Sequence, residues 1–196
     1  MKDYLIKQRP KISLILILIL FASNTITLIF DETQKYILLF SNLELIEPWN
    51  WYRLITYPLY IGGLITWFHN SLIIVLSGYI IENRLKKQDI IGLILLSSII
   101  GGLIYVLFNR DNPLIPMASP SMITWGYWAA AIVIGLNYWK SLILFEKIVL
   151  AFCLLSIISI WNDNIGVFLG QIIVILMISV LTLIQIKMKK QTVHNA

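Results

Sequence analysis

The 196-residue chain is 59% hydrophobic and only 13% charged, with a net charge of +5 and a mean hydropathy of +0.84. A soluble domain has about 45–50% apolar and roughly 25% charged residues. The composition therefore excludes a soluble domain and predicts a membrane protein with several spans. The single cysteine, Cys153, excludes an intrachain disulfide and a cysteine-rich metal site.

Six apolar segments follow one another, and each is long enough to cross about 30 Å of hydrocarbon as a helix. The predicted spans are 12–30, 59–81, 90–108, 121–138, 142–161 and 165–186. Together they predict one all-α membrane domain over 12–186, between an N-terminal segment (1–11) and a basic tail (187–196). The long link 31–58 is interrupted by charges and by Pro48, so we predict short amphipathic helices in the membrane interface there.

The second and fourth predicted spans differ from the others in composition. The second carries Thr66, His69 and Asn70 in an otherwise apolar sequence. Polar groups at membrane depth are costly and commonly face a protein interior or a wet cavity, so this face is a candidate functional surface. The fourth span is rich in glycine and alanine, including Gly126 and Gly135, and we predict that other helices surround it closely.

The basic residues predict the orientation of the bundle. If both termini share one side, twelve of the fifteen lysines and arginines lie on that side, and only Lys35, Arg53 and Arg110 lie on the other. Cytoplasmic loops carry the excess of basic residues, so both termini are predicted to be cytoplasmic. Because these residues lie in short loops rather than on one patch, the positive net charge does not indicate nucleic-acid binding.

The stretch between Trp51 and Glu82 contains an arginine and a threonine in Arg-Leu-Ile-Thr, starting at Arg53, then Asn70, and a Gly-x-x-x-Glu ending at Gly78 and Glu82. In types and ungapped spacing it resembles the rhomboid family of intramembrane serine proteases. The resemblance covers most of the chain and implies a six-helix membrane bundle with no cofactor or metal. Where the family has a tryptophan directly before the arginine, this chain has a tyrosine.

In the rhomboid family the nucleophilic serine opens the fourth helix in a GxSG motif, followed by an aromatic residue four positions later and a small residue five positions later. Ser121 fits this pattern, with Trp125 and Gly126 at the two later positions. The flanking glycines are replaced, because the motif here is Ser-Pro-Ser-Met. A second register makes Ser119 the nucleophile but loses the later aromatic and small residues, so Ser121 is preferred.

The catalytic base of the family is a histidine on the last helix, in an AHxxG motif. The matching stretch here is Gly-Val-Phe-Leu-Gly, which keeps Gly170 and places Val167 at the histidine position. A shift of one residue places Phe168 there instead, and neither side chain can accept a proton. The family's oxyanion site pairs a histidine on the second helix with an asparagine four residues later, and here Thr66 replaces the histidine while Asn70 is kept.

Two hypotheses follow from the missing base. The first is a rhomboid-like protein without proteolytic activity that binds transmembrane segments of other proteins, with Thr66, Asn70 and Ser121 in a polar cavity. The alternative is an active protease in which Ser121 or Ser119 uses an unusual base such as His69; the only other histidine, His194, lies in the tail. Membrane lipids are the other expected partners. The composition and the lack of targeting signals favour a bacterial inner membrane.

Overall fold

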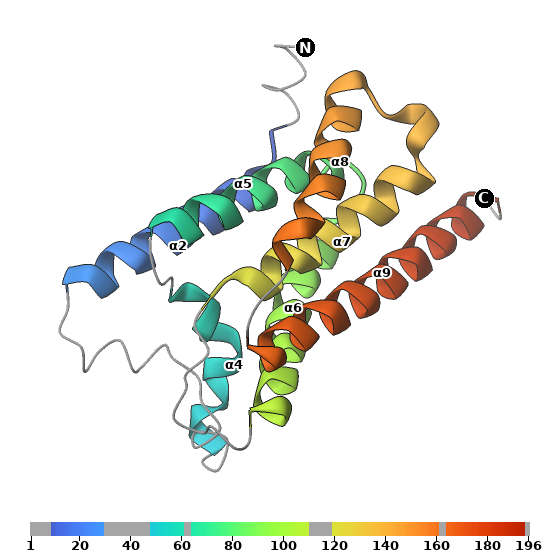
Figure 1. Ribbon diagram of the computed structural model, residues 1–196. Helices are drawn as coiled ribbons and strands as arrows, with labels where there is room; N and C mark the ends of the chain where they lie inside the picture. The colour runs from blue at the N-terminus through green and yellow to red at the C-terminus, as the bar shows by residue number, and fades with distance from the viewer. Residues whose placement is uncertain (1–8, 30–47, 61–63, 110–118, 161–163, 195–196) are drawn as a thin grey trace.

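The computed structural model describes residues 9–29, 48–60, 64–109, 119–160 and 164–194, and every regular element within them is helical (Figure 1). The predicted all-α class is therefore confirmed. The main helices are α2 (Lys11–Ile29), α5 (Leu64–Ile81), α6 (Lys87–Phe108), α7 (Ser121–Asn137), α8 (Leu144–Ser156) and α9 (Ile165–His194). Short helical turns lie between them: η2 (Pro48–Tyr52), α4 (Arg53–Thr56), η3 (Tyr57–Leu59), η4 (Trp139–Ser141) and η5 (Ile157–Ile160).

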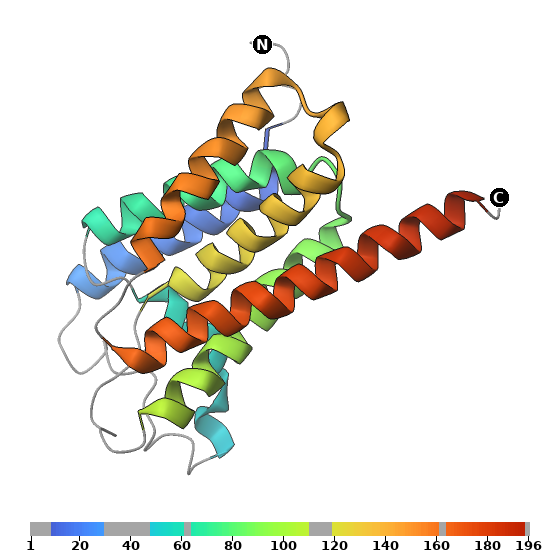
Figure 2. The same cartoon turned by 45° about the vertical axis from the view of Figure 1, so that its right-hand side comes forward.

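Helix α7 is the centre of the bundle. It contacts α5, α6, α8 and α9, and both ribbon views show it between the α2–α5 pair and α9 (Figures 1 and 2). Its small residues permit these close approaches: Gly126 packs against Ser97 of α6, and Gly135 packs against Leu150 of α8. Nearly all of α7 from Met122 to Ala131 is buried, as its composition predicts.

Three helices in the described part of the chain are long and apolar enough to cross a membrane, at Leu64–Ile81, Lys87–Phe108 and Ile165–Lys189. An apolar segment at Lys11–Ile26 is shorter. Helices α7 and α8, with 17 and 13 residues, are shorter than these three. The chain is thus an integral membrane protein, and the count of six spans stays a prediction.

Several helix boundaries differ from the predicted spans: α6 begins at Lys87 rather than at residue 90, and α8 ends at Ser156, where η5 follows, rather than at residue 161. The second span was predicted from residue 59, but α5 begins at Leu64, because Pro58 belongs to η3 and Tyr60 has an extended backbone. The last span was predicted to end at residue 186, but α9 continues to His194. No glycine or proline follows Ile186, and lysine and glutamine are good helix formers, so the helix continues into the basic segment.

The predicted interfacial link is described only from residue 48 onward, where η2, α4 and η3 are short helical turns. Tyr57 of η3 is fully buried, and its hydroxyl donates a hydrogen bond to the Ser98 carbonyl at 3.0 Å, which ties this link to α6. Predictions for residues 1–8, 30–47, 61–63, 110–118, 161–163 and 195–196 concern positions outside the described residues.

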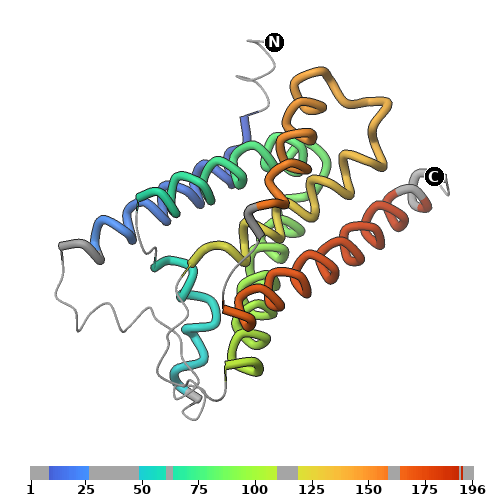
Figure 3. Tube along the Cα trace, in the orientation of Figure 1, coloured from blue at the N-terminus to red at the C-terminus, as the bar shows by residue number. Residues whose placement is uncertain are grey.

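The two ends of the bundle have different chemistry and are named here by their residues. The basic end is where α5 and α7 end and α6 begins; it carries Arg84, Lys86, Lys87, Lys140, Lys187 and Lys189. The serine end is where α7 and α9 begin, next to Ser121 and Val167. Because α7 and α9 both begin at the serine end, they run parallel through the bundle (Figure 3).

At the basic end Glu82 holds the first turn of α2. Its carboxylate accepts hydrogen bonds from the Ser13 amide at 2.7 Å, the Ser13 hydroxyl at 2.6 Å and the Ile12 amide at 2.9 Å. The first amides of a helix lack partners within the helix, and a negative charge there is favourable. A Cβ atom on Gly78 would lie 2.2 Å from the Ser13 hydroxyl, so only glycine permits this approach. The Gly-x-x-x-Glu pattern therefore docks α2 onto α5.

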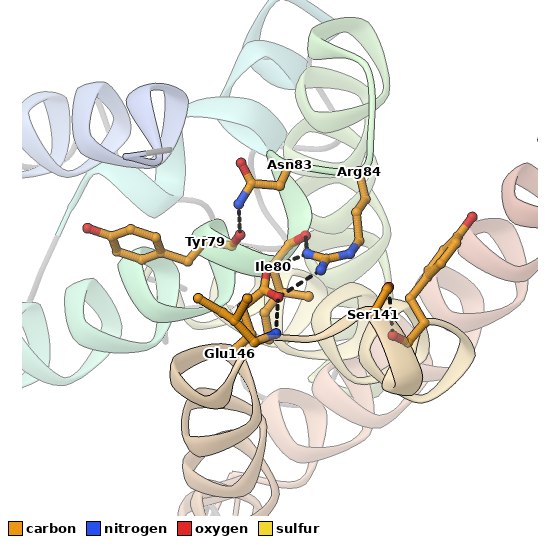
Figure 4. Close-up of polar contacts among 8 residues, drawn as sticks. Tyr79, Ile80, Asn83, Arg84, Ser141 and Glu146 are labelled. Atoms are coloured by element: carbon orange, nitrogen blue, oxygen red, sulfur yellow. Dashed lines mark hydrogen bonds and ion pairs between the residues drawn. The ribbon is translucent and has the colours of Figure 1, made fainter. Parts of the chain in front are cut away.

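A second carboxylate at the basic end joins α5 to α8. Arg84 and Glu146 point toward one another and form a two-pronged ion pair, with nitrogen–oxygen distances of 2.6 and 2.8 Å (Figure 4). Glu146 also accepts the Ile143 amide at 3.2 Å, so it caps α8 as well. The Glu146 side chain is almost completely buried.

Candidate functional site

Asn70 is a buried polar group that links α5 to α7. Its Oδ1 lies 2.7 Å from the Thr124 hydroxyl, which is also 3.1 Å from the Pro120 carbonyl. Its Nδ2 donates to the Thr66 carbonyl one turn earlier, at 2.8 Å. Both ends of the amide are therefore bonded within the bundle, so Asn70 forms a polar tie between two helices.

Ser121 is the first residue of α7. Its backbone amide donates to the Ser119 hydroxyl at 3.1 Å, so the two candidate nucleophiles lie next to one another at the start of α7. The Ser121 Oγ is buried and has no hydrogen-bond partner among the described residues. A serine becomes a nucleophile when a neighbouring group accepts its proton. Within the described residues, this hydroxyl has no such acceptor.

Met122 fills the space between α7 and two neighbouring helices. A Cβ atom added to Gly101 of α6 would lie 2.3 Å from the Met122 Cγ, and one added to Gly170 of α9 would lie 2.8 Å from its Cε. The Met122 side chain therefore occupies a socket that two glycines create. Because Met122 directly follows Ser121, this apolar contact lies immediately beside the candidate nucleophile.

Val167 lies in the first turn of α9, one turn before Gly170, and is half-buried against the apolar core. Its amide donates to the Asn164 Oδ1 at 3.1 Å, and Asn164 in turn donates to Asn109 of α6 at 3.1 Å. The polar groups that surround the start of α9 thus hold its backbone. The Val167 side chain itself offers only apolar contact.

His69 and Thr66 are exposed on α5, whereas the adjacent Asn70 is buried. Successive residues of an α-helix are about 100° apart around its axis, so a helix that directs Asn70 inward directs His69 away. The imidazole of His69 is the only histidine side chain that the structure describes, because that of His194 lies outside the described part.

The remaining residues of the resemblance are structural neighbours of α7 or lie apart from it. Trp125 is buried and its ring lies 5.7 Å from that of Trp128 in an edge-on pair. Gly126 is the close-approach point for Ser97. Arg53 of α4 places its guanidinium 5.8 Å from the centre of the Tyr52 ring and donates to the Tyr52 hydroxyl at 3.3 Å.

Asn70, Gly78 and Glu82 all lie within a segment that matches a known family. The family model of the rhomboid domain matches residues 48–191. The chain belongs to the rhomboid family. No curated protein and no solved structure matches it significantly. The match contains every position that carried the resemblance, from Arg53 to Gly170.

In this rhomboid, sequence reasoning missed three contributors to the site and its support. Thr124 supplies the partner of Asn70, and Met122 fills the Gly101–Gly170 socket. The Arg84–Glu146 pair was also missed. A glutamate within an apolar run, with an arginine in an earlier loop, was the available signal for this pair. Nothing in the sequence pointed to the socket, because methionine and glycine pack in many ways.

Proposed function

We propose that this rhomboid is not a protease and instead binds transmembrane segments of other membrane proteins. The observation that carries the proposal is the Ser121 hydroxyl, which is buried without a proton acceptor among the described residues. Val167 occupies the position of the family's histidine, and His69 is exposed on α5. Loss of one member of a catalytic set in serine proteases lowers turnover by about 10⁴ to 10⁶.

Packing beside the serine supports the same proposal. In the family motif a glycine follows the nucleophile, whereas Met122 follows Ser121 here and fills the socket between Gly101 and Gly170. The Met122 side chain occupies space between α6, α7 and α9 that a glycine at this position would leave empty. A packed methionine side chain therefore stands where the family motif has a glycine after its serine.

The exposed face of α5 supports the binding half of the proposal. Thr66 and His69 present a hydroxyl and an imidazole on the outer surface of a helix that is long and apolar enough to span the membrane. Polar groups at such positions are costly in hydrocarbon and commonly mark a functional contact. A partner helix with a polar residue of its own would provide the missing hydrogen bonds. This assigns recognition to the outer face of α5, since Asn70 is bonded internally.

The proposal includes a bacterial inner membrane as the location. The chain crosses it six times, and both termini lie on the cytoplasmic side. The ends of α5, α7 and α9 and the starts of α2, α6 and α8 all meet at the basic end, where most lysines and arginines lie. This distribution agrees with the positive-inside rule. Reporter fusions at each terminus test it, and a periplasmic signal from either fusion would reject this orientation.

A serine-reactive phosphonate probe tests whether the chain is a protease. The protein is labelled in membranes beside an active rhomboid protease as positive control, together with its Ser121→Ala, Ser119→Ala and His69→Ala variants. We expect no labelling of this chain. Labelling that disappears in both Ser121→Ala and His69→Ala would show a working serine–histidine pair and overturn the proposal.

Binding is tested in lipid nanodiscs with fluorescent transmembrane peptides that carry either a central asparagine or a leucine. We expect the asparagine peptide to bind more tightly, and His69→Phe with Thr66→Val to abolish that preference. The matched control is Phe68→Leu, which changes an exposed apolar residue on the same turn. Equal binding of both peptides to wild-type protein would contradict recognition by polar groups.

A further inference from the structure

A cavity of about 350 Å³ opens at the basic end, between the α5–α6 connection, the end of α7 and the last turns of α9. Its wall combines two kinds of surface. Arg84, Lys86 and Lys189 contribute cations, while Ile134 and Ile186, both buried, contribute an apolar floor. The volume is in the range of ligand sites in proteins.

The charges that line this cavity do not cancel. Arg84 is neutralised by Glu146, and Asp89 accepts the Lys86 backbone amide at 3.3 Å. The Lys189 ammonium donates to the Arg84 carbonyl at 3.3 Å, which directs it toward the connection between α5 and α6. The remaining charged residues of the lining are Lys86, Lys189 and Asp89, which together carry a net charge of one positive unit. The cavity therefore suits an anion.

A narrower groove continues from the cavity along the bundle. It lies between α6 and α9, has a volume of about 170 Å³, and shares Asp89 and Gln185 with the cavity. Its apolar wall is made of Leu93, Leu96, Ile178 and Leu181, and Gln88 and Thr182 add polar groups beside the shared Asp89 and Gln185. At Gly92 an added Cβ would meet nothing within 4 Å, so this glycine leaves the groove open and serves no close helix contact.

Together these features match the shape of one lipid molecule. The cavity lies at the membrane boundary, because the spanning helix α5 ends at Ile81 and α6 begins at Lys87. Phosphates lie at this depth, and acyl chains extend inward from it. We propose that this rhomboid binds one anionic glycerophospholipid, with its phosphate between Lys86 and Lys189 and an acyl chain in the groove beside Gly92.

The proposal is tested on full-length protein in detergent by native mass spectrometry, with phosphatidylglycerol, phosphatidylcholine or inorganic phosphate added. Lys86→Gln with Lys189→Gln removes the two lining lysines. The matched control, Lys87→Gln with Lys187→Gln, removes the same charge from neighbouring exposed positions that do not line the cavity. Each lysine near a membrane surface contributes enough attraction for anionic lipid to change affinity several-fold. We expect about a tenfold loss of phosphatidylglycerol binding for the lining pair and less than twofold for the control.

A steric variant separates a lipid from free phosphate. Gly92→Leu places a side chain in the open groove, where the helix tolerates it, and Gly92→Ala is the size control. We expect Gly92→Leu to weaken phosphatidylglycerol binding at least fivefold, with no effect on phosphate. Unchanged lipid binding in this variant, or binding of phosphate alone, would overturn the lipid assignment. Equal loss in both lysine pairs, or equal binding of both lipids, would reject a defined anionic site.

Discussion

The basic end and the serine end of this rhomboid contain polar groups of different kinds. At the basic end, two carboxylates each hold the start of a helix: Glu82 bonds to α2, and Glu146 bonds to α8 and to Arg84. At the serine end some buried hydroxyls have no partner in the described part of the chain, including those of Ser121 and Thr56.

This difference separates the scaffold of the family from its chemistry. The Gly78–Glu82 pattern survives with a visible structural task, which is to dock α2. Asn70 also survives, and its amide ties α5 to α7. By contrast, Val167, which stands where the resemblance places the catalytic base, packs against the apolar core. Gly78, Glu82 and Asn70, which carry the resemblance to the family, thus hold helices together. The four predictions below compare how much the contacts at the two ends contribute to stability.

The largest effect is expected from Glu146→Ala at the basic end. It leaves the Arg84 guanidinium without its partner in a nearly buried setting and removes the cap of α8. Breaking a buried pair from one side costs about 3–5 kcal/mol. Reversible unfolding in mixed micelles measures this loss. Lys147→Ala, at the adjacent position, is the control, and a comparable loss in that variant would mean that the pair has no special role.

Met122→Ala tests the socket at the serine end. The side chain is fully buried between Gly101 and Gly170, so its truncation leaves a cavity and should cost about 3 kcal/mol. The same unfolding assay measures it, with exposed Met177→Ala on α9 as the matched control. A loss below that of the control would show that the helices close over the socket and that its packing is not specific.

Glu82→Gln tests the docking of α2. The amide retains one acceptor oxygen, and the charge-assisted bonds to the Ile12 and Ser13 amides weaken, for a loss of about 2 kcal/mol. Asn83→Ala is the control, because it truncates the exposed polar residue next to Glu82, and the Asn83 amide donates to the Tyr79 carbonyl one turn earlier. Thermal melts of both variants should differ by several degrees; identical melts would argue against the cap.

The smallest effect is expected from Thr124→Val, which keeps the shape and leaves the Asn70 Oδ1 without its donor. Hydrogen bonds between helices in membranes contribute about 0.6 kcal/mol on average and under about 2 kcal/mol at most. Thr182→Val is the control, because that buried hydroxyl bonds to the Ile178 carbonyl of its own helix. If Thr124→Val destabilises no more than Thr182→Val, the tie between α5 and α7 is not a stabilising element.

Much of the architecture could be predicted from local sequence patterns. Apolar length located the main helices, and small residues identified α7 as the central one. Asn70, Gly78 and Glu82 were singled out by their resemblance to the rhomboid family. The start of α5 and the end of α9 could not be predicted from hydropathy. Hydropathy indicates which residues lie in the membrane, whereas helix ends depend on proline, capping groups and helix propensity.

The sequence by itself determined that this is a helical membrane protein of the rhomboid family and that Val167 stands where the resemblance places a histidine. Those conclusions depend on composition and on spacing within single segments. Only the tertiary structure decided that Glu82 caps α2, that Glu146 pairs with Arg84 and that Met122 fills a socket of two glycines. Each of these contacts joins residues far apart in the chain, and their pairing depends on how the helices pack.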